Sequence, residues 1–69
     1  MKRVEVESST IRSAGHDEKT NTLEIEFHSG RTYQYFDVPR HVFDELLNAP
    51  SAGSFLASEI KGVYRYARA

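Results

Sequence analysis

The chain has 69 residues, enough for one domain but too few for both a full hydrophobic core and a deep substrate cavity. It contains no cysteine, which excludes disulfides, thiolate zinc sites and a cysteine nucleophile and favours a cytoplasmic location. The net charge is −1 and the longest apolar run covers only residues 55–57, so we expect neither a strong overall attraction to nucleic acid nor a membrane span.

The first part of the chain predicts short extended segments. Residues 4–7 alternate apolar with acidic side chains, a period of two that is typical of a strand. Residues 11–14 predict a second short strand that ends at Gly15. The polar residues 17–21 predict the turn that follows it.

The clearest predicted strand covers residues 22–28. Three apolar side chains alternate there with polar ones, so one face should be buried and the other solvated. These apolar residues are Leu23, Ile25 and Phe27.

A hairpin should connect this strand to residues 31–36, and the loop length decides where the tyrosines of the second strand point. A two-residue turn would need positive φ at Ser29 or a glycine in the first position. A three-residue loop with Gly30 in the left-handed conformation fits the sequence better.

The register that follows from this loop pairs Ile25 with Tyr33 and Leu23 with Tyr35. Both tyrosines then join the apolar face. A slip of one residue would place them on the acidic face instead, because side chains alternate between the two faces of a strand.

Two helices are predicted in the second half. Pro39 suits the first turn of a helix with one apolar stripe, and Pro50 ends this helix. Ser51 is a suitable cap for the second helix, which Gly62 can end. Residues 63–66 fit either a longer helix or an extended tail. The stripe of the first helix consists of Val42, Phe43, Leu46 and Leu47.

Together these elements predict an α+β fold: a small antiparallel sheet of about three strands, packed on one face by two helices. Residues 1–69 should form a single domain. We expect one core that contains Phe27, Tyr33, Tyr35, Phe43, Leu46 and Phe55.

Short motifs recur in a specific order over nearly the whole chain. They are Ser8-Ser9-Thr10-Ile11, Gly15-His16-Asp17, residues 23–27, Gly30, Tyr33-Gln34-Tyr35, Val38-Pro39, Leu46-Leu47, Ala49-Pro50-Ser51, Gly53, Phe55, Ile60 and Tyr64. This order, and the Tyr-x-Tyr motif above all, resembles the KTSC domain. That short module is named for its place at the C-terminus of some lysyl-tRNA synthetases and also occurs as a free-standing bacterial protein.

The resemblance implies a domain of unassigned function, for which RNA binding has been suggested from its attachment to a tRNA-handling enzyme. Two residues depart from the family pattern. His16 stands where the family more often has Tyr, and Phe43 stands where Tyr is common. A role that needs a phenol at either position is therefore not expected here.

Tyr33 and Tyr35 are the first candidate site. An aromatic pair two residues apart on a strand can stack unpaired bases. The same pair can equally complete the apolar face of the sheet, with each hydroxyl reaching the edge. The sequence leaves both interpretations open.

The C-terminal tail is the second candidate, because basic side chains alternate there with tyrosines. Such a segment can follow a phosphate backbone and stack on bases. The alternative is that Tyr64 packs and the arginines are solvated. Four further basic residues extend the patch only if the fold brings them close: Lys2, Arg3, Arg12 and Arg31. The candidate contacts in the tail are Lys61, Tyr64, Arg65 and Arg68, with Tyr66 between the arginines.

Ser51 and Gly53 are the third candidate, since the start of the second helix offers hydroxyls and unpaired N–H groups to an anion. Plain helix capping explains the same residues, with Gly53 needed for close packing against the sheet.

No catalytic, cofactor or metal site is predicted. No serine lies in a nucleophile elbow, and no glycine-rich phosphate loop occurs. The histidines show no ligand spacing. They are His16, His28 and His41.

The sequence therefore predicts a small non-catalytic binding module, with RNA as the partner that the resemblance implies. The alternative is a protein-interaction module that uses a sheet edge or the surface of the helix pair. The two differ in surface chemistry, because RNA needs clustered positive charge and an interaction module needs an apolar patch or an open edge.

Overall fold

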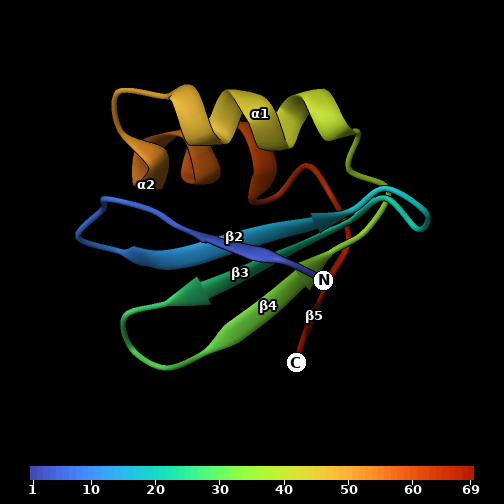
Figure 1. Ribbon diagram of the computed structural model, residues 1–69, viewed down its shortest axis with the longest axis horizontal. Helices are drawn as coiled ribbons and strands as arrows, with labels where there is room; N and C mark the ends of the chain where they lie inside the picture. Colours follow the sequence, from blue (N-terminus) through green and yellow to red (C-terminus); the bar gives the residue numbers. More distant parts are fainter.

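An antiparallel sheet carries two helical segments on one of its faces (Figure 1). The computed structural model describes residues 1–69. The strands lie side by side in chain order: β1 Arg3–Glu5, β2 Ile11–Asp17, β3 Thr22–Phe27, β4 Thr32–Tyr35 and β5 Tyr66–Arg68. Helix α1 covers Arg40–Asn48, and α2, Ala52–Phe55, continues into the π-helical turn η1, Leu56–Ile60.

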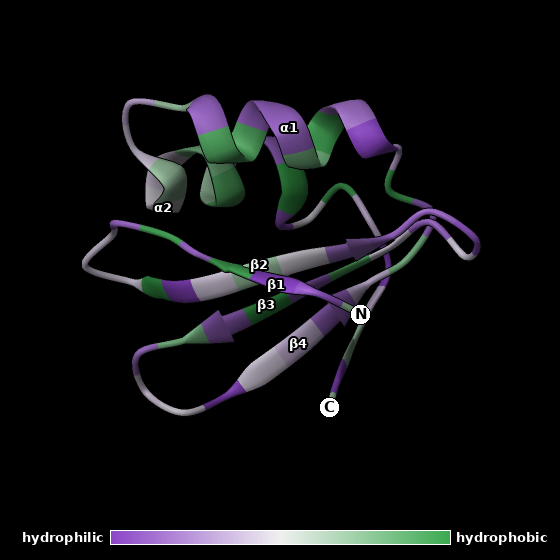
Figure 2. Cartoon of the chain, viewed as in Figure 1, coloured by the Kyte–Doolittle hydropathy of each residue, from purple (hydrophilic) through white to green (hydrophobic).

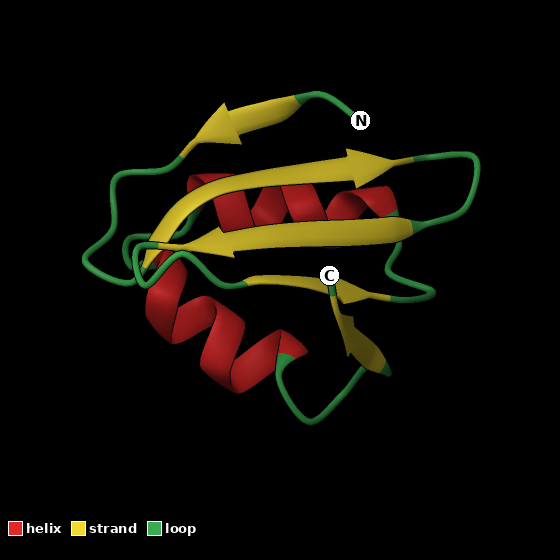
Figure 3. Ribbon diagram, turned by 90° about the horizontal axis from the view of Figure 1, so that it is seen from below, coloured by secondary structure: helices red, strands yellow, loops and turns green.

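Both helical segments belong to the connection between β4 and β5. Figure 3 shows the molecule from below, with the helices behind the sheet. It places α1 behind β2 and β3 and the second helical segment toward β4 and β5. None of the helices combines the length and apolar character needed to cross a membrane.

The sheet has five strands, so the predicted number of about three is wrong. The additional strands, β1 and β5, form the two edges of the sheet. Residues 4–7 indicate an extended segment near β1 and residues 63–66 allow one near β5, but each strand has only three residues, all exposed, and nothing in the sequence shows which strand it pairs with. The tail is extended because Gly62, at φ +82°, ends the preceding helical segment.

Strand β2 also runs further than predicted, because it passes through Gly15 and ends at Asp17. Gly15 pairs with Arg3 of β1 on one side and with Glu24 of β3 on the other. A Cβ atom at Gly15 would lie 2.8 Å from the carbonyl oxygen of Lys2. The glycine therefore marks a close approach of the N-terminal backbone rather than the end of a strand.

The predicted β3–β4 hairpin is confirmed. Ile25 pairs with Tyr33 and Leu23 with Tyr35. The Phe27 amide donates to the Arg31 carbonyl at 2.8 Å, which closes a loop of residues 28–30. Gly30 has the expected left-handed conformation, with φ +94°.

The helices begin and end close to where the sequence places them. Pro39, in extended conformation, lies one residue before α1. Ser51 caps α2, since its Oγ accepts a hydrogen bond from the Ser54 amide at 3.2 Å. In η1 the Lys61 amide donates to the Leu56 carbonyl at 2.8 Å, so this turn is one residue wider than an α-helical turn.

The core lies between the helices and the sheet, and the apolar residues of α1 face it (Figure 2). Of the six residues expected to share a core, Tyr35, Phe43 and Leu46 are buried. The other three are partly buried and pack against the same cluster: Phe27, Tyr33 and Phe55.

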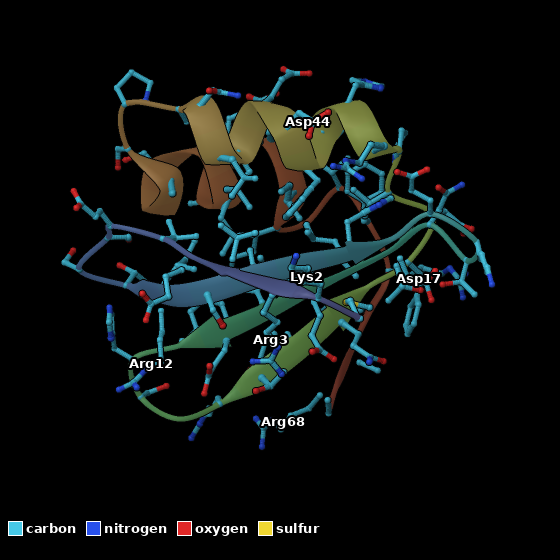
Figure 4. All side chains as sticks on the ribbon, viewed as in Figure 1. Lys2, Arg3, Arg12, Asp17, Asp44 and Arg68 are labelled. Atoms are coloured by element: carbon cyan, nitrogen blue, oxygen red, sulfur yellow. The ribbon has the colours of Figure 1, made fainter.

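The opposite face of the sheet holds a charged network around Arg3, which lies away from the helices (Figure 4). Its guanidinium forms ion pairs with Glu24 at 2.7 Å and Glu26 at 3.1 Å, and the Gln34 amide donates to Glu24 at 2.9 Å. The hydrogen bond from Gln34, together with Arg3, lowers the pKa of the Glu24 carboxyl below its ordinary value of 4.5.

The free energy of unfolding should therefore depend on the charge of Glu24. Because its pKa is lower in the folded state, its contribution is present above pH 4.5 and is lost as the pH falls through the folded value. Urea titrations should show a loss of stability in the parent between pH 6 and pH 3. In Glu24→Gln this loss should be smaller by up to about 1 kcal/mol. A variant profile as steep as that of the parent would count against this role.

Candidate nucleic-acid interface

Three tyrosine rings lie next to one another where β4 pairs with β5. The antiparallel register places Tyr66 opposite Tyr35 and Arg68 opposite Tyr33. The rings of Tyr33 and Tyr66 are nearly parallel, at 11°, with centroids 5.5 Å apart. Tyr35 lies 5.9 Å from Tyr66. Strand pairing thus joins aromatic residues that are far apart in the sequence.

The three rings differ in how accessible they are. Tyr35 is 2% exposed and belongs to the core, and burial raises the pKa of its phenol above the ordinary value. Tyr33 is half-buried. Tyr66 is 61% exposed. The two interpretations left open by the sequence therefore apply to different residues: Tyr35 is a core residue, whereas Tyr33 and Tyr66 present ring surface.

Positive side chains surround these accessible rings. The Arg68 guanidinium lies 5.9 Å from the centroid of the Tyr33 ring, within the range of a cation–π interaction. Interaction with Arg68, and to a smaller extent with Arg31, lowers the pKa of the Tyr33 phenol below its ordinary value. The chain's overall charge is slightly negative, so this region is positive by local arrangement only.

A hollow of about 270 Å³ lies beside the rings, between β4 and the second helical segment. We call it the tyrosine hollow. Its charged lining residues are Arg31 and Lys61, and no carboxylate lines it. Its apolar walls include Phe27, Tyr33 and Leu56. The tyrosine patch is the name used below for Tyr33, Tyr66, Arg31, Lys61 and Arg68.

The structure divides the tail candidates between two places. Lys61 and Arg68 belong to the tyrosine patch. Arg65 instead lies 5.6 Å from the Phe36 ring and forms an ion pair with Asp37 at 3.0 Å. Tyr64 is half-buried and packs against the core.

Two members of the patch, Arg31 and Tyr66, were named in the sequence but could be placed only by the fold. Arg31 follows the β3–β4 loop, and only the fold shows that it lines the same hollow as Lys61. Tyr66 lies two residues before Arg68, so its strand position gives both the same face. The two-residue spacing of Tyr66 and Arg68 was the signal in the sequence that both share one face. It can be used only once the tail is known to be a strand.

Ser51 and Gly53 line a second hollow, of about 360 Å³, which we call the hydroxyl hollow. The Ser51 Oγ accepts from the Ser54 amide, so the capping interpretation of this residue holds. Gly53 is not required for close packing, because a Cβ there would lie 3.4 Å from Thr10 Oγ1, an ordinary contact. The other hydroxyls of this hollow come from Ser8, Ser9, Thr10 and Ser54.

The histidines make structural contacts. The His16 Nε2 donates to the Val38 carbonyl at 2.7 Å, and its ring stacks on Phe43 with centroids 5.8 Å apart. The two residues that depart from the family pattern thus contact each other. The His28 Nε2 donates to the Ser8 carbonyl at 2.8 Å. No three side chains of histidine, aspartate or glutamate gather closely enough to hold a metal ion.

Comparisons with known proteins agree with this architecture. The KTSC domain family matches residues 7–64. The crystal structure of a KTSC domain protein from Yersinia pestis has a TM-score of 0.95 and 37% sequence identity, and the match covers 99% of this chain and 96% of that one.

Relatives of two sizes also match. A lysine–tRNA ligase from Nostoc punctiforme is 45% identical over 60 residues, which make up 87% of this chain but only 11% of the ligase. An uncharacterized protein from Stutzerimonas stutzeri is 45% identical over 69 residues, which cover 99% of this chain and 97% of that protein. The fold, the family match and these relatives agree: the chain belongs to the KTSC domain family, whose function is unassigned.

Proposed function

We propose that this chain is a non-catalytic, cytoplasmic module that binds single-stranded RNA at the tyrosine patch. The observation that carries the proposal is the parallel pair of Tyr33 and Tyr66 with Arg68 beside it. An exposed aromatic ring on a strand provides a surface on which an unpaired base can stack.

The charges near the rings support an anionic ligand. Arg31, Lys61 and Arg68 are close to the accessible rings, and the tyrosine hollow contains no carboxylate that would repel a phosphate. The opposite face of the sheet is less suitable, because Glu24 and Glu26 already pair with Arg3 there. The likeness to a segment of lysine–tRNA ligases is consistent with an RNA partner.

A salt titration tests this proposal. Three cations on a single strand should give a slope of log affinity against log salt of about −2, since each phosphate contact contributes about −0.7. Arg68→Gln should make the slope shallower by about 0.7. Tyr66→Ala should weaken binding by about 5- to 150-fold, the loss of one stacked base. Fluorescence anisotropy of a labelled RNA measures both effects.

Arg65→Gln is the matched control. It removes the same charge from the same tail, but Arg65 is paired with Asp37 outside the tyrosine patch. Its salt slope should equal that of the parent. Absence of RNA binding at low salt, or an equal change of slope in Arg65→Gln and Arg68→Gln, would disprove binding at this patch.

One observation favours the alternative, a protein-interaction module. A hollow of about 400 Å³ between β1 and α1 is lined by several apolar side chains, among them Val4, Val6 and Leu47, together with Glu5 and Glu7. It adjoins the β1 edge of the sheet, where an extended peptide can add as a further strand. If RNA fails to bind, this surface becomes the better candidate.

A further inference from the structure

The tyrosine hollow and the hydroxyl hollow lie next to each other and share part of their walls, and we call the two together the groove. Three residues line both of them: Thr10, Gly53 and Ala57. The groove therefore has an aromatic, positively charged end and a hydroxyl-rich end, which meet at these small side chains. A ligand longer than one group can occupy both ends.

Gly53 lies where the two hollows adjoin. The residue lies in a helix without positive φ, and a Cβ there would make only ordinary contacts, at 3.4 Å and 3.6 Å, with Thr10 and Ser8. Alanine would therefore fit the fold and is the better helix former. Neither backbone conformation nor packing therefore requires a glycine, and a methyl group there would fill space where the two hollows adjoin.

The hydroxyl end suits a sugar better than a phosphate. Its charged lining residue is Glu7, which repels a phosphate but can accept hydrogen bonds from sugar hydroxyls. The Ser8 Oγ accepts from the Thr10 and Ile11 amides at 3.1 and 3.2 Å, which leaves its own proton free to donate. His28 holds the Ser8 carbonyl and so fixes this loop.

We propose that this groove distinguishes RNA from DNA. A base lies in the tyrosine hollow, with a backbone phosphate near Arg31 and Lys61. The ribose that joins them lies in the hydroxyl hollow. The 2′-hydroxyl of this ribose is both a donor and an acceptor of hydrogen bonds. It pairs with the hydroxyl of Thr10 and with those of the neighbouring serines. This inference rests on the proposed RNA binding. It adds that the 2′-hydroxyl is the feature of the ligand that the groove selects.

The test compares oligouridine RNA with oligodeoxyuridine DNA of the same length, about eight nucleotides. The parent should bind the RNA about fivefold more tightly, which corresponds to about 1 kcal/mol, the net contribution of one hydrogen bond. Thr10→Val keeps the shape of the side chain and removes its hydroxyl. It should reduce the preference for RNA to less than about twofold.

Gly53→Ala should weaken RNA binding by about fivefold while the melting temperature stays equal or rises, because the added methyl narrows the groove in a stable helix. The control is Ser58→Ala, an exposed position on the same helical segment outside both hollows, which should change neither affinity nor preference. Equal binding of RNA and DNA by the parent, or a preference unchanged in Thr10→Val, would overturn this inference and leave RNA binding standing. Binding of neither probe would overturn both proposals.

Discussion

Replacing Leu46 by alanine should lower the free energy of unfolding by about 2 to 5 kcal/mol. Its side chain is 0% exposed and lies in the core between α1 and the sheet. A domain of 69 residues has a total stability of roughly 3 to 10 kcal/mol. The substitution should therefore remove a large part of the stability, and urea denaturation followed by circular dichroism measures it.

Leu47 provides the matched control. It is the next residue of the same helix, but it is 36% exposed. Leu47→Ala should cost about 1 kcal/mol, clearly less than Leu46→Ala, because about a third of the residue is already in contact with water. Equal losses at the two positions would show that the apolar face of α1 is oriented differently from that described here.

Replacing Gly15 by valine should cost about 3 kcal/mol, at the upper end of the range for overpacking. A Cβ at this position would lie 2.8 Å from the Lys2 carbonyl oxygen, which is backbone and cannot swing aside. The N-terminal strand would have to leave the sheet, and Arg3 would lose its ion pairs with Glu24 and Glu26. NMR shifts of β1 and the melting temperature should report both losses.

A deletion separates these two effects. Removing residues 1–5 takes away β1 and should make the further cost of Gly15→Val small, because the obstructing backbone is gone. If valine at position 15 remains equally destabilising in the shortened chain, the close approach of Lys2 is not the cause.

The sequence was most informative where a short-range geometric rule applied. The length of the loop around Gly30 determined the register of the hairpin, and the register determined that Tyr33 and Tyr35 share the face of Ile25. Local rules also identified Ser51 as a cap and Gly62 as the end of the second helix. These features depend on a few neighbouring residues, so one sequence is sufficient to predict them.

Features that depend on distant partners were less predictable. The alternation in residues 4–7 indicated an extended segment near β1, but no local pattern showed that β1 and β5 pair at the edges of the sheet. Gly15 looked like a strand end because the backbone that approaches it, that of Lys2, comes from the distant N-terminal segment. Arg65 and Arg68 look equivalent in the sequence, yet only Arg68 lies beside Tyr33. Their separation follows from the pairing of β5 with β4, which no local pattern encodes.

The position of β5 links ligand binding to the local opening of the fold. This strand has three exposed residues at the edge of the sheet, and its pairing closes a long connection of residues 36–65. Such segments open more readily than the core. Tyr66 and Arg68 leave the tyrosine patch whenever β5 detaches, so a ligand at this patch should hold β5 in place. The Phe36 amide donates to the Arg65 carbonyl and the Ala69 amide to the Thr32 carbonyl, both at 2.9 Å. Hydrogen exchange of these two amides should therefore be slower when the ligand is bound.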